Sequence, residues 1–215
     1  MKKLLGKIRN DQANELSMVK RLVSYGLDWY VGAMIASLPI IITYMFRNDE
    51  VGIVPMSLSV LSTPDSLSAG GVSFLVAIGY YALVPALVWP GQTLGKKMLK
   101  LKIVSNDYRQ ARIRQIFNRQ ILAILIVEGS VYSSSNILHQ LLTILFKVNI
   151  AGVYGYLGLG VTGISIGLVL ILKSKRALHD FIAGTRVVDL GAISYQNIQK
   201  KIKKTDRKQL RFSKG

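Results

Sequence analysis

Long apolar runs, separated by polar and basic stretches, dominate the hydrophobic pattern of the chain. The four longest runs lie at about 22–46, 72–89, 121–146 and 153–172. A bilayer core about 30 Å thick requires roughly 20 helical residues, so each run has a length that suits a transmembrane helix. The third run is interrupted by polar residues at 133–136, which leaves open whether it forms one tilted helix or two pieces. The pattern predicts an all-α membrane protein, a bundle of four transmembrane helices.

The stretches between these runs are more polar and predict short surface segments. Residues 47–71 contain proline, glycine, serine and acidic residues, which favours a loop and leaves open an interfacial or re-entrant piece at 51–62. Residues 98–105 alternate apolar and basic side chains, which is typical of a short strand or an extended surface segment. Residues 111–120 form a basic amphipathic segment that leads into the third run. From residue 196 onward the chain is densely charged, and we expect a mobile tail there.

Lysine and arginine are sorted along the chain. Of the 28, six lie in residues 1–21, eight in 90–120 and twelve in 173–215, and only Arg47 and Lys147 lie elsewhere. Basic residues close to the ends of spans mark the cytoplasmic side, so the sorting predicts a multi-pass membrane protein with both termini in the cytoplasm. The net charge of +17 indicates a bilayer with anionic lipids as partner, and no nucleic acid, because a soluble nucleic-acid binder would have no reason to sort its cations in this way.

This division predicts three parts of the chain. A basic cytoplasmic N-terminus at 1–21 precedes a transmembrane domain at 22–190, and a basic cytoplasmic tail at 191–215 follows. Neither a repeat nor a second soluble domain is apparent in the sequence.

Composition and motifs exclude several kinds of chemistry. The chain has no cysteine and two histidines, which excludes thiolate metal sites and does not favour a histidine-built one. The segment GQTLGKK at 91–97 resembles a phosphate-binding loop only superficially. It has three residues between its glycines instead of four, and Lys97 stands where a serine or threonine is required. We therefore expect neither an enzyme nor a bound cofactor or metal.

Four ionisable side chains lie in or at the edge of the apolar runs: Arg21, Asp28, Glu128 and His139. A carboxylate inside a bilayer is costly, so it usually faces a partner or water. Arg21 and Asp28 are seven residues apart and share a helix face, and Glu128 is expected at a matching depth in the third run. Two such carboxylates predict either a cation- or proton-binding site that Arg21 tunes or a pair that brackets a basic group, but purely structural roles fit both acids as well. His139 fits a satisfied polar residue better than a proton relay.

The fourth run carries many glycines on one helical face. Gly155, Gly160, Gly163 and Gly167 lie within one sector of the helical wheel. Small residues on one face allow another helix to approach closely. The face therefore predicts helix packing, either within the chain or against a second copy.

Three blocks, in this order, resemble the RDD family of small bacterial membrane proteins. RLVSYGLDWY opens the first run, GQTLGKKMLKLKIVSNDYRQ follows the second, and RALHDFIAGTRVV follows the last. The resemblance covers about residues 18–190, and the arginine and two aspartates that name the family correspond to Arg21, Asp28 and Asp180. The residues that the second and third blocks place in a cytoplasmic motif are Gly91, Gln92, Thr93, Gly95, Lys96, His179 and Asp180.

The resemblance implies topology more than mechanism. Some members of the family are thought to be cation/proton antiporters, and others look like accessory partners of membrane or secretion proteins. We expect transport of cations, protons or a small solute, with Asp28 and Glu128 as coupling carboxylates; a bundle of four spans is thin, so such a transporter would need to form a homodimer. The alternative is a non-catalytic accessory or immunity-type protein that binds another membrane protein. His179 and Asp180 would tie the terminal segment to the middle loop or to Arg21, as a gate or as a structural clasp.

Overall fold

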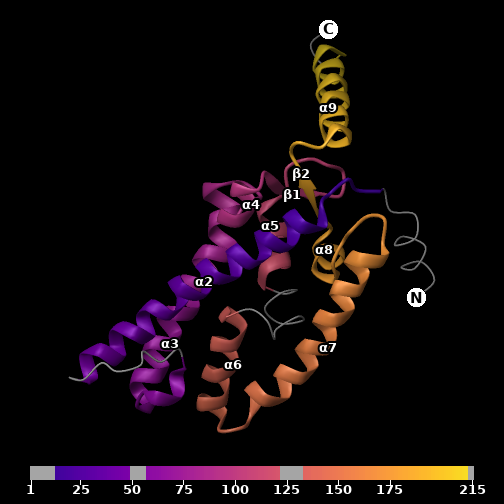
Figure 1. The fold of residues 1–215 in the computed structure, drawn as a ribbon. Helices are drawn as coiled ribbons and strands as arrows, with labels where there is room; N and C mark the ends of the chain where they lie inside the picture. Colours follow the sequence, from indigo (N-terminus) through magenta and orange to yellow (C-terminus); the bar gives the residue numbers. More distant parts are fainter. Residues whose placement is uncertain (1–12, 49–56, 122–132, 213–215) are drawn as a thin grey trace.

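The computed structural model describes residues 13–48, 57–121 and 133–212, and these residues are mostly helical (Figure 1). The helices, in chain order, are α2 (Met18–Arg47), η1 (Leu58–Val60), α3 (Thr63–Ile78), η2 (Gly79–Val88), α4 (Leu94–Met98), α5 (Ile113–Phe117), α6 (Ser133–Phe146), α7 (Ile150–Ile171), α8 (Leu178–Ala183) and α9 (Ile193–Phe212). The two strands are β1 (Leu101–Ser105) and β2 (Thr185–Asp189).

Three helices in the described part of the chain are long and apolar enough to cross a membrane. They are α2, the continuous helix Thr63–Val88 made by α3 and η2, and residues Gly152–Ile171 of α7. The predicted third span, 121–146, lies partly outside the described residues, and its described portion, α6, is a shorter apolar helix. The chain is therefore a membrane-type helical protein, and its fourth span stays a prediction.

The predicted loop at 47–71 is wrong in its second half, because helix α3 already begins at Thr63. Ser62 caps the helix by accepting from the backbone N–H of Asp65, and Pro64 lies in the first turn, where its missing N–H costs nothing. Asp65 places a negative charge at the positive end of the helix and pairs with Arg47 at 2.8 Å.

Small side chains let the helices of the bundle approach each other closely. α2 packs against α3, and α6 packs against both. Ala36 and Ala77 meet Ile137 of α6 in one cluster, while Ile40, Leu58 and Ala69 form a second. These contacts suit a bilayer, where van der Waals packing of small residues holds helices together. Within the described part of the chain, α7 packs mainly against α6 and α8.

The cap, defined as residues 91–121 and 173–190, lies at the end of the bundle where α2 begins and α7 ends (Figure 1). Its centre is an antiparallel pair in which β1 runs beside β2 from Leu101↔Asp189 to Ser105↔Thr185. The strand predicted within 98–105 is thus confirmed, and the all-α expectation is wrong for the cap. The apolar core beneath the hairpin consists of Leu16, Leu101, Ile103, Ala111, Ile116 and Val187.

The expected mobile tail from residue 196 onward is wrong, because α9 is a helix that runs from Ile193 to Phe212. Its apolar side chains recur at helical spacing and pack on the outer face of the hairpin. The contacts join Tyr195, Ile198 and Ile202 to Val104, Tyr108 and Val188. The tail gains order because these three side chains find an apolar surface on the cap.

Candidate functional site

Asp28 of α2 is buried, and four donors saturate its carboxylate. Oδ1 accepts hydrogen bonds from Tyr80 Oη at 3.0 Å and from the backbone N–H of Gly95 at 2.8 Å. Oδ2 accepts from Thr93 Oγ1 and from Lys96 Nζ, the latter at 2.7 Å. A carboxylate has about four lone-pair positions, so all of them are used. The ammonium of Lys96 supplies the countercharge inside this network.

Three of these donors lie at the N-terminal end of the short helix α4. Thr93 is its N-cap residue, and Gly95 lies in its first turn, where backbone N–H groups have no partner within the helix. Asp28 supplies that partner from α2, with its negative charge at the positive end of α4. Gly95 is required for this contact, because an added Cβ would lie 2.4 Å from the carbonyl oxygen of Ser24.

The preceding residues of the same block fix α4 to the hairpin. Gly91 has φ of +78°, and its carbonyl accepts from the backbone N–H of Ile103 at 2.7 Å. Gln92 donates from Nε2 to the carbonyl of Leu101 at 2.7 Å. The glycine allows a left-handed turn that most residues adopt only with strain. The block GQT therefore positions α4 against Asp28.

Two consecutive tyrosines of η2 also donate hydrogen bonds to Asp28 of α2. Tyr80 binds the Asp28 carboxylate, and Tyr81 Oη donates to the backbone carbonyl of Asp28 at 2.9 Å. Gly32 makes room for the second ring, because a Cβ there would lie 2.1 Å from Tyr81 Oη. Segments of π-helix such as η2 are frequent at functional sites. Tyr80 was not predicted from the sequence; a pair of hydroxyl-bearing rings inside an apolar run was the available signal.

Lys96 is the titratable cation of this network. Its side chain is largely buried, and it also lies 3.0 Å from Thr93 Oγ1. Burial lowers the pKa of Lys96, and the nearby guanidinium groups of Arg119 and Arg21 act in the same direction, whereas the Asp28 carboxylate opposes this by raising it. The charge of Lys96 therefore depends on Asp28.

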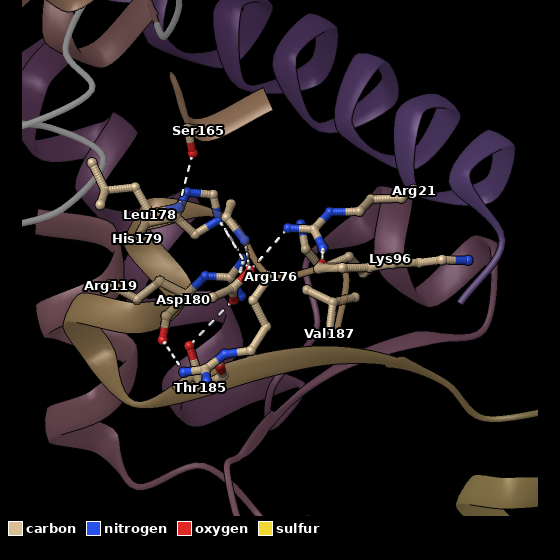
Figure 2. Close-up of polar contacts among 12 residues, drawn as sticks. Arg21, Lys96, Arg119, Ser165, Arg176, Leu178, His179, Asp180, Thr185 and Val187 are labelled. Atoms are coloured by element: carbon tan, nitrogen blue, oxygen red, sulfur yellow. Dashed lines mark hydrogen bonds and ion pairs between the residues drawn. The ribbon is translucent and has the colours of Figure 1, made fainter. Parts of the chain in front are cut away.

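Asp180 of α8 forms a second buried centre, which is surrounded by arginine (Figure 2). Oδ2 accepts from Arg21 Nη2 at 2.9 Å and from the backbone N–H of Ala177 at 3.0 Å. Oδ1 lies 3.3 Å from Arg119 Nη2. Burial alone would raise the pKa of Asp180, but Arg119, His179 and Arg21 hold it well below its usual range. The carboxylate is therefore ionised and joins α2, α8 and the segment that follows α5.

The sequence placed Arg21 on the helix face of Asp28, and it also expected Asp180 to be tied to Arg21 or to the middle loop. The second expectation is confirmed, because Arg21 pairs with Asp180 across 159 positions of chain. Arg21 also donates to the carbonyl of Lys175. His179 contributes to the same centre, since its Nε2 lies 2.8 Å from Arg119 Nη2. Arg119 was not predicted; its signal was that it is the last cation before the third apolar run.

The remaining predicted residues lie away from these two centres or outside the described part of the chain. Glu128 falls within 122–132 and so lies outside the described residues. His139 is buried on α6, with its ring 4.8 Å from that of Tyr154. Side chains added at four glycines of α7 would meet no atom within 4 Å; these are Gly155, Gly160, Gly163 and Gly167. Among the described residues, no group of three or more His, Cys, Asp or Glu is placed to hold a metal ion.

We expect Gly95→Ala to destabilise the contact between α4 and α2. The new Cβ would meet the Ser24 carbonyl oxygen at 2.4 Å and Asp28 Oδ1 at 3.0 Å, and overpacking of this kind costs about 1–3 kcal/mol. The measurement is the thermal unfolding midpoint of purified protein. Gly26→Ala is the matched control, because a Cβ at Gly26 of α2 meets nothing within 4 Å. Equal midpoints for both variants would contradict the close approach.

Comparison with known proteins adds a family and one relative. The model of the RDD family matches residues 16–184. A protein of Bacillus subtilis (strain 168) described as uncharacterized protein YckC is 31% identical over 113 residues, which are 53% of this chain and 56% of the relative. The chain thus spans about half the length of this curated relative. No solved structure matches. The matched range contains Asp28 with its four donors, and Asp180 with Arg21 and Arg119.

Proposed function

The chain belongs to the RDD family, and from this premise we propose that it exchanges a small cation for a proton across the bacterial plasma membrane. Asp28 is the cation-binding carboxylate, and Lys96 releases the proton. The observation that supports this role is the buried pair of Asp28, inside a candidate span, with Lys96, a cation that can lose its charge. Glu128 is retained as a second candidate carboxylate, outside the described residues.

The two buried aspartates differ in the kind of cation that balances them, and this difference distinguishes a pair that can exchange a proton from one that is structural. Asp180 is balanced by Arg21 and Arg119, and guanidinium groups stay protonated at every physiological pH. Asp28 is balanced by Lys96, and buried lysines change their protonation state readily. Arg21 therefore belongs to a clasp around Asp180 and is not the group that tunes Asp28.

The exchange follows from competition for one carboxylate. A cation that binds Asp28 displaces the ammonium of Lys96, and the interaction that raises the pKa of Lys96 is then lost. The buried ammonium releases its proton and becomes a neutral amine. When the bound cation is monovalent, as sodium and potassium are, the pair gains one positive charge and loses one as the proton, so the step is electroneutral. Deprotonated Lys96 takes up a proton again when the cation leaves.

The proposed orientation places both termini and the cap in the cytoplasm. Three basic segments of the sequence, 1–21, 90–120 and 173–215, flank or form the cap, and Arg47 lies at the opposite end of α2. Basic residues near span ends are retained on the cytoplasmic side, where anionic lipids attract them. Asp28 would then lie near the cytoplasmic end of its span.

We expect Asp28→Asn to abolish cation-driven proton flux while the protein remains folded. Asparagine keeps the size and accepts hydrogen bonds, but its neutral amide neither balances Lys96 nor attracts a cation. The measurement is proton flux driven by sodium or potassium gradients in liposomes that contain purified wild-type or variant protein. Unchanged flux in the variant would remove Asp28 from the path.

An absence of flux from well-folded wild-type protein, over several cations and pH values, would favour the accessory or immunity-type role. The observation that favours this second candidate is the open glycine face of α7, at Gly155, Gly160, Gly163 and Gly167. A helix of another membrane protein, or of a second copy in a homodimer, would pack there.

A further inference from the structure

Helix α9 presents a strongly basic surface that the proposed exchange does not use. Between residues 200 and 207 it carries five exposed cations: Lys200, Lys201, Lys203, Lys204 and Arg207. At 3.6 residues per turn these side chains fall within an arc of about 160°. Ile202, the one apolar side chain between them in sequence, is half-buried against the hairpin.

The opposite face of α9 is already occupied by the cap. Tyr195, Ile198 and Ile202 pack on the hairpin, and Gln199 donates to the carbonyl of Tyr108 at 2.6 Å. Asp206, the one acidic residue of the helix, lies on this side and pairs with Arg109 of the cap at 2.8 Å. The apolar face is therefore unavailable for insertion into a bilayer, and the cations point away from the protein.

The direction of α9 carries these cations away from the membrane. The helix rises from the hairpin on the side opposite to α2, α3 and α7 (Figure 1). Lys200 comes seven residues after Ile193, about 10 Å along the axis, and Arg207 lies about 10 Å further. Surface charge is screened over about 8 Å at physiological ionic strength, so the outer cations gain little from the headgroups of the protein's own membrane.

The composition of this surface favours a nucleic acid over an acidic protein as its partner. The core of a protein–protein interface is depleted of lysine and relies on buried aromatic or apolar anchors. No such anchor lies among the exposed cations between Lys200 and Arg207. Phosphodiester backbones need only cations at suitable spacing, because release of their counterions supplies the affinity. Lys200, Lys204 and Arg207 form a nearly straight row, with steps of roughly 6 Å and 4.5 Å along the helix.

We infer that α9 binds the phosphate backbone of double-helical nucleic acid on the cytoplasmic side, through the row Lys200, Lys204 and Arg207 and the flanking Lys201 and Lys203. This contact rests on the orientation proposed above but not on cation exchange. It departs from the sequence expectation of no nucleic-acid partner, which rested on the sorting of cations along the chain. Because α9 is a helix that packs on the hairpin, its cations have a fixed geometry.

The test is equilibrium binding of the full chain in nanodiscs of phosphatidylcholine, a neutral lipid. The probes are fluorescein-labelled RNA and DNA duplexes of one sequence and about 20 base pairs, titrated from roughly 50 to 200 mM salt. For the triple variant Lys200→Gln, Lys204→Gln and Arg207→Gln we expect about tenfold weaker binding or more, and a salt dependence of log K that is shallower by about 2.7, since each phosphate contact contributes about 0.9. Glutamine preserves the helix.

The matched control removes three exposed cap cations instead, in the triple variant Lys97→Gln, Arg112→Gln and Arg114→Gln, and is expected to bind the duplexes as wild type does. Stronger binding of one duplex identifies RNA or DNA as the source. Equal binding by the α9 variant and wild type would overturn the inference. Binding of both proteins to phosphatidylglycerol vesicles is measured in parallel. If the α9 variant loses binding to these vesicles but not to the duplexes, the inference is overturned, because α9 then binds a membrane surface. The assay contains no ion gradient, so absence of exchange activity does not affect it.

Discussion

Replacing Lys96 with arginine is expected to abolish cation-driven proton flux while the protein stays folded. Arginine preserves the positive charge that balances Asp28 and can donate to the same carboxylate, so the ion pair is retained. Its guanidinium stays protonated and does not release a proton under physiological conditions. A cation could then bind only by leaving an additional charge in a buried site, which is costly.

The measurement for Lys96→Arg is the liposome flux assay, with the thermal unfolding midpoint as a check on folding. Flux should fall to the level of protein-free liposomes. Arg21→Lys is the reciprocal control: it changes the base at Asp180 without changing the pair at Asp28, and is expected to retain exchange. Wild-type flux in Lys96→Arg would show that the amine is not the proton carrier, even if Asp28 is essential.

The sequence identified residues of the two buried centres better than it identified which of them meet. The three blocks do converge at the cap, and Thr93, Gly95 and Lys96 surround Asp28. The helical wheel placed Arg21 with Asp28 because they share a face, but such reasoning concerns one helix only. Lys96 is 68 positions from Asp28, so the partner depends on how α4 packs against α2.

Two local errors had signals in the sequence, whereas a third prediction concerns residues outside the described part of the chain. Ser62 and Pro64 mark the start of α3, yet their polarity was interpreted as part of a loop. Tyr195, Ile198 and Ile202 recur at helical spacing in α9, but the surrounding charge suggested disorder. The depth of Glu128 relative to Asp28 lies outside the described residues. The lengths of the apolar runs alone located α2 and α7 to within a few residues, because the thickness of the bilayer sets the length of a transmembrane helix.

Asp180→Asn is expected to destabilise the protein more than any other single change to an acidic residue of the cap. The carboxylate is fully buried and is shared by Arg21 and Arg119, whose charges would remain. Breaking a buried ion pair by removing one partner costs about 3–5 kcal/mol. For a protein of this size that corresponds to roughly 10 °C in the thermal unfolding midpoint. Asp206→Asn is the matched control, because its pair with Arg109 is exposed and such pairs contribute at most about 1 kcal/mol.

The pH dependence of this loss gives an independent test of the clasp. The pKa of Asp180 is lower in the folded protein than in the unfolded chain, where an aspartate titrates near pH 3.9. Its stabilising contribution is therefore complete above about pH 4 and is lost as the pH falls through the lower folded value. The difference between the unfolding midpoints of wild type and Asp180→Asn should be constant from about pH 7 to 5 and shrink below about pH 4. A difference that does not shrink in acid would mean that the ionised carboxylate contributes little, and that Asp180 matters through its hydrogen bonds to Ala177 and Thr185.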